Sequence, residues 1–313
     1  MKKFNFALLI AIMIFTLTAC STEQPKQQEQ QQTETTEIQL PTKDMAGNDI
    51  TVPTEINKII SLAPSITEML VDLGYGDKIV AADTYSEGIE GLPEGIEYID
   101  MMAPDAEKIA ALEPDVLLAT GMMQKDGIDP LKALKDMGIC VAYIPSSDSI
   151  EKIYADIIFI SEIVQAKDKG QALVDEAKAK VAEIKAIGDT ITDKKSVYFE
   201  IAAAPSMYSF GTGVFLNEMI EIIGAENILA DQQSWLSVSE EAVIAANPDV
   251  IITNVDYIEN AVDEIKARSG WNNVTAVSSN EVYFIENDIT SVPNHNFVKG
   301  LQKMAEAVYP DKY

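Results

Sequence analysis

The feature that most constrains the fold of this chain is an internal repeat. Residues 109–119 (IAALEPDVLLA) and 243–253 (VIAANPDVIIT) share a helical stretch, a Pro-Asp pair and an apolar run, in that order. Because proline cannot continue a helix and restricts the residue before it, each Pro-Asp pair predicts a corner between a helix and a buried strand. Residues 68–74 and 218–224 are also alike, and each ends on a glycine suited to the end of a helix. The two sets occur in the same order, which predicts two similar lobes.

The segments around the repeats alternate in pattern. Short apolar runs predict strands, and amphipathic stretches such as 67–73 and 131–137 predict helices between them. This alternation favours an α/β fold with two Rossmann-like lobes and mainly parallel sheets. The predicted strands are residues 58–62, 79–82, 116–119, 139–144, 197–201, 250–253 and 282–285.

A long helical region lies between the two halves. Residues 150–163 form one predicted helix, with Asp148 as its N-cap. Residues 166–187 are rich in Ala, Lys, Glu and Leu, which favour a helix, and a helix of that length would extend about 33 Å. Such a helix would join the lobes as a rigid rod. We expect an N-terminal lobe at 38–165, a connecting backbone helix at 166–187 and a C-terminal lobe at 188–313.

The first residues carry the features of a targeting segment. Two lysines precede a mostly apolar stretch at residues 4–18, which is too short for a membrane span, and the segment ends in Leu-Thr-Ala-Cys at 17–20. This matches the bacterial lipobox, in which the cysteine becomes the first residue and is acylated. The alternative is a plain secretory signal with a chance cysteine. We expect a signal peptide at 1–19 and, at 20–37, lipidated Cys20 with a Gln-, Glu- and Thr-rich disordered tether. The protein would be extracytoplasmic and would contact the bacterial cell membrane through this lipid alone.

Composition excludes several classes of function. The formal net charge is −27 and Arg268 is the one arginine, so the clustered basic residues that nucleic acids require are missing. His295 is the one histidine, which leaves no His pair for a metal and no Ser-His-Asp set without it. Cys140 lies in an apolar run and is expected in the core. Since common hydrolase, zinc-protease and phosphate-loop motifs are also missing, we expect no catalytic residues and no metal site. The alternatives are a surface enzyme, such as a chelatase or hydrolase, and a structural lipoprotein.

Four stretches together carry a family resemblance. They are residues 44–53, residues 59–68, the two Pro-Asp repeats and residues 271–285. With these, most of the chain resembles the solute-binding proteins of ABC importers for cobalamin and iron chelates, in which one helical backbone joins two lobes (class III of the periplasmic binding proteins). The resemblance implies a monomer without a cofactor of its own. It would capture a small-molecule metal complex between its lobes and deliver the complex to the permease subunits.

The resemblance also implies one carboxylate on each lobe that docks on the permease. The matching positions are Glu107 and Glu241, each seven residues before its Pro-Asp pair. Two symmetrically placed carboxylates can form paired hydrogen bonds with arginine side chains of a partner and fix its orientation. The alternative is that both are solvated glutamates near the start of a helix.

The resemblance further implies a ligand site in the loops that follow the strands. Tyr85, Tyr208 and Trp235 stand where cobalamin receptors carry aromatic contacts, and Asp288 also matches a pocket position. Met101 departs from the pattern, because those relatives often have Trp there. Ordinary packing is the alternative for each aromatic side chain. The expected ligand-site residues are Ser65, Tyr85, Met101, Met122, Tyr208, Trp235, Asp288 and His295.

The scarcity of arginine limits the charge of the ligand. Receptors for anionic ferric catecholates need several arginines, so a neutral or cationic ligand is expected. Cobalamin or another corrinoid comes first, a hydroxamate-type iron chelate second and haem third. Haem would need an axial ligand such as His295, Tyr85 or Tyr208, although we expect His295 at the pocket rim or beside a helix N-terminus. A bare zinc or manganese ion is disfavoured, because such sites need several His or a His-carboxylate cluster.

Overall fold

The computed structural model describes residues 40–124 and 127–313. The predicted signal peptide, Cys20 and the tether at 20–37 lie outside these residues. None of the helices in the described part of the chain combines the length and the hydropathy that crossing a bilayer requires.

A five-stranded parallel sheet forms the centre of the N-terminal lobe. Its strands are β1 (Ile59–Leu62), β2 (Ile79–Asp83), β3 (Glu97–Ile99), β4 (Val116–Thr120) and β5 (Cys140–Ile144). They are ordered β3-β2-β1-β4-β5, so β1 lies in the middle. Every residue of β1, β4 and β5 is buried, which is why these strands stand out as mostly apolar runs. Cys140 is buried as expected, and burial raises the pKa of its thiol to about 11.

The C-terminal lobe has a second parallel sheet and a small antiparallel one. The parallel sheet is ordered β11-β10-β6-β8 and contains β6 (Ser196–Glu200), β8 (Glu226–Asn227), β10 (Val250–Thr253) and β11 (Val282–Phe284). The antiparallel pair is β7 (Tyr208–Phe210) and β9 (Trp235–Ser237), which the sequence pattern did not predict. All seven predicted strands are present, with ends that differ by a residue or so.

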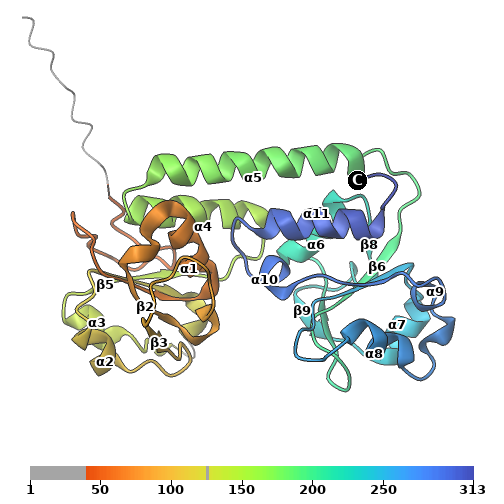
Figure 1. The fold of residues 1–313 in the computed structure, drawn as a ribbon, viewed down its shortest axis with the longest axis horizontal. Helices are drawn as coiled ribbons and strands as arrows, with labels where there is room; N and C mark the ends of the chain where they lie inside the picture. The colour runs from red at the N-terminus through yellow and green to blue at the C-terminus, as the bar shows by residue number, and fades with distance from the viewer. Residues whose placement is uncertain (1–39, 125–126) are drawn as a thin grey trace, which may run out of the picture. The chain divides into compact units, whose positions relative to one another are not determined.

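Short helices cover both sheets (Figure 1). In the N-terminal lobe, α1 (Pro64–Leu70) continues as a π-helical turn, η1 (Val71–Tyr75), and is followed by α2 (Ala106–Ala111) and α3 (Lys132–Asp136). Inside η1, Gly74 has a φ of +86°, which ends the regular helix at the predicted glycine. The C-terminal lobe contains α6 (Phe215–Ile222), α7 (Glu240–Ala246), α8 (Ala261–Ala267), α9 (Thr275–Ser278), α10 (Asn287–Thr290) and α11 (Phe297–Val308).

The two Pro-Asp corners have the same geometry in both lobes. The residue before each proline, Glu113 or Asn247, adopts a left-handed conformation with φ near +50°. Asp115 accepts hydrogen bonds from the backbone amides of the two residues before β1, at 2.7 and 2.9 Å. Asp249 likewise accepts from the backbone amide and hydroxyl of Ser196, at 2.8 and 2.7 Å. The aspartate of each repeat therefore ties the incoming helix to the start of the central strand.

Two long helices form a layer that extends over both lobes (Figure 1). They are α4 (Ile150–Ile163), with the predicted bounds, and α5 (Lys167–Gly188), one residue later at each end than predicted. The predicted N-cap of α4 was wrong. Ser149, with an extended backbone, accepts the hydrogen bond from the Lys152 amide, whereas Asp148 forms an exposed ion pair with the Lys152 ammonium at 2.7 Å.

A continuous apolar core connects the lobes through this layer. It includes Ile59 of β1, Ile157 of α4 and Val197 of β6, all fully buried. Helix α5 packs on α4 and also on α6 and α11 of the C-terminal lobe. The structure thus confirms the predicted α/β fold, with two mainly parallel sheets joined by one long helix.

The contact between α4 and α5 depends on a glycine. Gly170 of α5 is buried, and a Cβ atom placed on it would lie 2.4 Å from the Cβ and 2.1 Å from the hydroxyl of Ser161 on α4. Such distances are far below van der Waals contact. Gly170 therefore permits close helix packing and is not a hinge.

We predict that Gly170→Ala destabilises the protein, although alanine in a helix is more favourable than glycine by about 1 kcal/mol. Forcing the helices apart should lower the free energy of unfolding by about 1–3 kcal/mol in urea denaturation. The neighbouring exposed change Gln171→Ala is the control and should stay within about 0.5 kcal/mol of the parent. The double variant Gly170→Ala/Ser161→Gly should recover part of the loss. A Gly170→Ala protein as stable as the parent would contradict the close packing.

Candidate functional site

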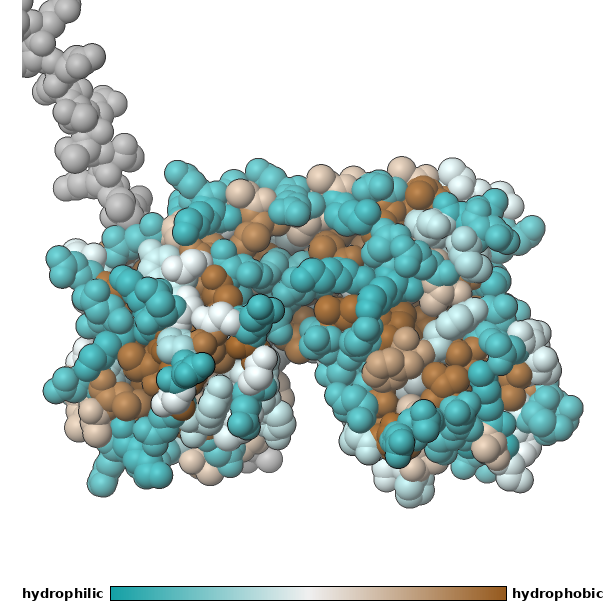
Figure 2. Space-filling model, viewed as in Figure 1, coloured by the Kyte–Doolittle hydropathy of each residue, from teal (hydrophilic) through white to brown (hydrophobic). Residues whose placement is uncertain are grey.

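A cavity of about 1150 Å³ lies between the two lobes. On the N-terminal side it is lined by α1, α4 and the segments that follow all five strands of the sheet. On the C-terminal side it is lined mainly by α10, the start of α11 and the loop between them. Figure 2 shows the lobes separated by a notch that is open on the side away from α5. In open α/β sheets, ligands bind at the carboxyl ends of the strands, which is where this cavity lies.

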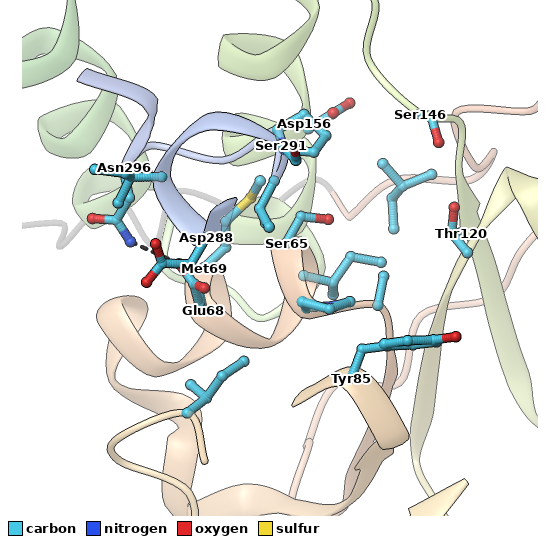
Figure 3. Close-up of a pocket in the computed structure, with 18 of the residues that line it drawn as sticks. Ser65, Glu68, Met69, Tyr85, Thr120, Ser146, Asp156, Asp288, Ser291 and Asn296 are labelled. Carbon is cyan, nitrogen blue, oxygen red and sulfur yellow. Dashed lines mark hydrogen bonds between the residues drawn. The ribbon is translucent and has the colours of Figure 1, made fainter. Parts of the chain in front are cut away.

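The cavity brings together five of the residues predicted for a ligand site. Ser65, Tyr85, Met101 and Met122 line it from the N-terminal lobe, and Asp288 of α10 lines it from the other lobe. Figure 3 shows Ser65, Tyr85 and Asp288 among the side chains around it. The family resemblance implied these positions, in loops that follow strands, and the structure puts them around one cavity.

Three predicted residues lie outside the lining of the cavity. Tyr208 of β7 and Trp235 of β9 are 37% and 42% exposed, and the rings of Trp235 and Phe210 form a T-shaped pair with centroids 5.8 Å apart. In Figure 1, β9 lies at the edge of the C-terminal lobe that borders the gap between the lobes. His295 is buried and hydrogen-bonded through Nε2 to Asp72, a residue of η1 that does line the cavity.

The loop that carries Tyr85 is fixed by a buried polar network. Asp83, at the end of β2, accepts hydrogen bonds from the Tyr85 amide at 2.9 Å and from the Ser86 hydroxyl. The Ser86 hydroxyl is also 3.0 Å from that of Thr67 on α1. Burial raises the pKa of Asp83, and the hydrogen bonds only partly oppose this effect. The backbone is thus held in place while Tyr85, which lines the cavity, remains 69% exposed.

A second buried carboxyl, Asp156 of α4, lines the cavity itself. It is 3% exposed and accepts a hydrogen bond of 2.6 Å from the Ser147 hydroxyl. Burial raises the pKa of Asp156 to about 7. The hydrogen bond from Ser147 and the charge of Lys152 lower this pKa, but by less than burial raises it. No pattern in the sequence singled out this group, because Asp156 occupies the interior face of an otherwise ordinary helix.

Carboxylates dominate the charge around the cavity. Among the charged residues that line it, Lys299 is the one base. The acids are Glu68, Asp72, Glu87, Glu90, Asp156, Asp256 and Asp288. Arg268 is instead buried in the C-terminal lobe, where it pairs with Glu200 at 2.7 Å and with Glu264 at 2.5 Å. A site of this charge attracts cations and repels anions. In residues 40–124 and 127–313, no group of three or more His, Cys, Asp or Glu side chains is placed to hold a metal ion.

The sequence analysis missed one exposed aromatic residue near the gap. Tyr257 follows β10 and is 67% exposed, and its hydroxyl accepts a hydrogen bond of 2.9 Å from the Ala203 amide. Its neighbour Asp256 lines the cavity. The available signal was its place just after a predicted strand, in the kind of loop where the resemblance implied the ligand site.

The two predicted docking glutamates occupy equivalent positions. Glu107 is the second residue of α2 and Glu241 the second residue of α7, and both are exposed. The adjacent Glu240 differs, because it accepts a hydrogen bond of 2.9 Å from the indole of Trp271. Each lobe therefore presents an accessible carboxylate at the start of the helix that leads to its Pro-Asp corner.

We predict that Asp156→Asn stabilises the protein in a pH-dependent way. The pKa of Asp156 is raised on folding, so the native state favours the protonated acid, and stability falls as pH rises from about 4 to about 7. Asparagine keeps an acceptor for Ser147 and cannot ionise. The variant should gain stability over the parent across this range, by about 1–4 kcal/mol above pH 7 in urea denaturation.

The control for this prediction is Glu176→Gln, which removes an exposed carboxylate on α5. Its difference from the parent should be small and nearly independent of pH. A stability difference for Asp156→Asn that stays constant between pH 4 and pH 8 would contradict the raised pKa.

Comparison with known proteins identifies the family. The family model described as "Periplasmic binding protein" matches residues 59–289. An uncharacterized ABC transporter substrate-binding lipoprotein of Bacillus subtilis is 32% identical over 312 residues, which cover 98% of this chain and 96% of that protein. A cobalamin-binding protein of Halobacterium salinarum is 23% identical over 322 residues, covering 99% of this chain and 86% of the relative.

A solved structure agrees with the sequence relatives. It is that of a possible iron-binding, periplasmic solute-binding protein from Staphylococcus epidermidis, with 30% identity and a TM-score of 0.73. The alignment covers 82% of this chain and all of that one. The chain therefore belongs to the periplasmic binding protein family and is a substrate-binding protein of the ABC-transporter type.

Proposed function

We propose that the protein binds a bulky metal complex in the cavity between its lobes and delivers it to the permease of an ABC importer. A corrinoid such as cobalamin is the first candidate, and a hydroxamate-type iron chelate is the second. The observation that carries the proposal is the cavity, because its volume of about 1150 Å³ lies somewhat above the range of about 300–1,000 Å³ that is usual for small-molecule sites. In this role the protein acts as a monomer and performs no reaction of its own.

The side chains at the gap support a large and partly apolar ligand. Tyr85 lines the cavity, and Tyr208, Trp235 and Tyr257 leave exposed aromatic surface on the C-terminal lobe. Aromatic faces provide a large contact area at low entropic cost, which suits a flat macrocycle. The relative described as a cobalamin-binding protein and the possible iron-binding protein of known structure support the same two ligand classes.

The charge of the cavity supports a neutral or cationic complex. The residues that line the cavity include one lysine and seven acidic side chains, so the cavity would repel a highly charged anionic chelate. Haem ranks third. Its two propionates would face this negative field, and His295 hydrogen-bonds with Asp72 and does not line the cavity.

The protein would work outside the cytoplasm, anchored to the bacterial cell membrane through lipidated Cys20. The Bacillus subtilis relative described as a lipoprotein supports this location. We further propose that Glu107 and Glu241 dock on the permease. Their equivalent, exposed positions on the two lobes support paired hydrogen bonds with arginines of the partner.

Titration calorimetry tests the ligand. We expect one-to-one binding of cyanocobalamin or of the ferric complex of desferrioxamine B, and weaker or no binding of hemin and of a ferric catecholate. Tyr85→Ala should weaken binding about 10-fold, because the exposed ring supplies contact area from a fixed loop.

The control for Tyr85 is Met137→Ala, which removes an exposed apolar side chain that does not line the cavity. It should leave the affinity unchanged. If none of the four complexes releases heat with the parent protein, the proposed function is wrong. Tight binding of the ferric catecholate alone would contradict the argument from charge.

Charge reversal tests docking. Glu107→Arg and Glu241→Arg should each reduce uptake of the ligand into cells, and the double variant should abolish it, while the affinity of the purified protein is unchanged. Glu176→Arg, on the exposed side of α5, is the matched control and should transport normally. Loss of ligand affinity in the docking variants would show that these glutamates act elsewhere.

A further inference from the structure

Five side chains form a polar contact between the two lobes beside the cavity. We call it the lobe clamp, and it consists of Glu68 and Asp72 from the N-terminal lobe with Asn294, His295 and Asn296 from the C-terminal lobe. One oxygen of Glu68 accepts hydrogen bonds from the Asn294 amide group at 2.7 Å and from the Asn296 amide group at 2.8 Å. Asp72 bonds with Nε2 of His295. Figure 3 shows the contact between Glu68 and Asn296.

The local structure on each side fixes these groups. Glu68 and Asp72 are four residues apart along α1 and η1, so their carboxylates lie on one face. On the other side, the Asn294 side-chain oxygen accepts from the Asn296 backbone amide at 2.7 Å, which closes a tight turn before α11. Asn294 is fully buried and His295 is 9% exposed. The Asn294 and His295 side of the clamp is therefore shielded from water, whereas Glu68 is half-buried and Asp72 is exposed. Hydrogen bonds to charged groups contribute most where water is excluded, so the two bonds to Glu68 should contribute more than the bond to Asp72.

The clamp holds the segment that forms one wall of the cavity. Every C-terminal residue that lines the cavity lies within 287–299, with the single exception of Asp256. The segment is compact, since a Cβ placed on Gly300 would lie 2.3 Å from the carbonyl oxygen of Ile289. Phe297 adds a second contact to the helical layer, with its ring centroid 6.1 Å from that of Tyr154 on α4.

We propose that Glu68 and Asp72 are positioning residues, which hold the wall at 287–299 against the N-terminal lobe and so form the cavity before any ligand is present. A preformed cavity binds more tightly, because less ordering is required on binding. The effect on affinity rests on the proposed function, whereas the position of the wall does not.

The clamp can be disrupted by substituting residues that do not line the cavity and so would not contact a ligand in it. Asn294 and His295 do not line the cavity, whereas Glu68 and Asp72 do. The test therefore uses Asn294→Ala/His295→Ala as the main variant and Glu68→Gln as the conservative one, because the glutamine oxygen still accepts hydrogen bonds. Asp77→Ala is the control, since it removes an exposed carboxylate five residues from Asp72.

The first measurement is amide hydrogen exchange of the ligand-free proteins. In the double variant, exchange across 287–299 should accelerate at least about 10-fold, while β6 and β10 of the same lobe stay unchanged. Glu68→Gln should show a smaller increase, and Asp77→Ala none. A purely structural role would accelerate exchange throughout the lobe. Unchanged exchange at 287–299, or a uniform increase, would overturn the proposal.

The second measurement is calorimetry with cyanocobalamin and with the ferric complex of desferrioxamine B. The double variant should bind about 10-fold more weakly than the parent, although neither changed residue lines the cavity. Equal affinity would overturn the positioning role and leave the proposed function intact. If the parent binds neither probe, the proposed function is wrong, and hydrogen exchange alone decides whether the clamp holds the wall.

Discussion

The close packing of α4 on α5 is the constraint on which the rest of the structure depends. Gly170 allows the two helices to approach until Ser161 fills the space that a side chain would need. The apolar core then runs from β1 through this layer to β6 without interruption. A wide swing of one lobe would expose that core to water, which is costly in proportion to the apolar area. Recognition must therefore rely on a cavity whose walls are nearly in place.

Much of the fold was predictable because its strands are parallel and buried. Both faces of β1, β4 and β5 are buried, so most of their residues are apolar and each strand appears as a short apolar run. The short strands β7 and β9 were not predictable, since each has three residues, one of them a serine, and forms no continuous apolar run. Asp148 and Ser149 can both cap a helix, and the backbone conformation of Ser149, which the sequence does not reveal, decides between them.

The candidate site was predictable where it follows strands and not where it depends on distant contacts. Ser65, Tyr85 and Asp288 stand in loops or short helices directly after strands, and the parallel sheets bring those segments together. Asp156 acquires its raised pKa from burial, which only the packed structure supplies. His295 and Asp72 are more than 200 residues apart, and their contact exists because the helical layer sets how the two lobes meet.

The same rigidity limits how a permease can distinguish loaded from empty protein. If Glu107 and Glu241 dock on the permease, the distance between them is set by the helical layer and by the shared core, and it changes little when a ligand binds. Any difference between the loaded and the empty protein must then lie in individual side chains at the gap between the lobes. The exposed aromatic side chains of Tyr85, Tyr208, Trp235 and Tyr257 are the parts that a ligand can order without moving either parallel sheet. Ligand binding would be signalled by the mobility of these parts and not by the spacing of the lobes.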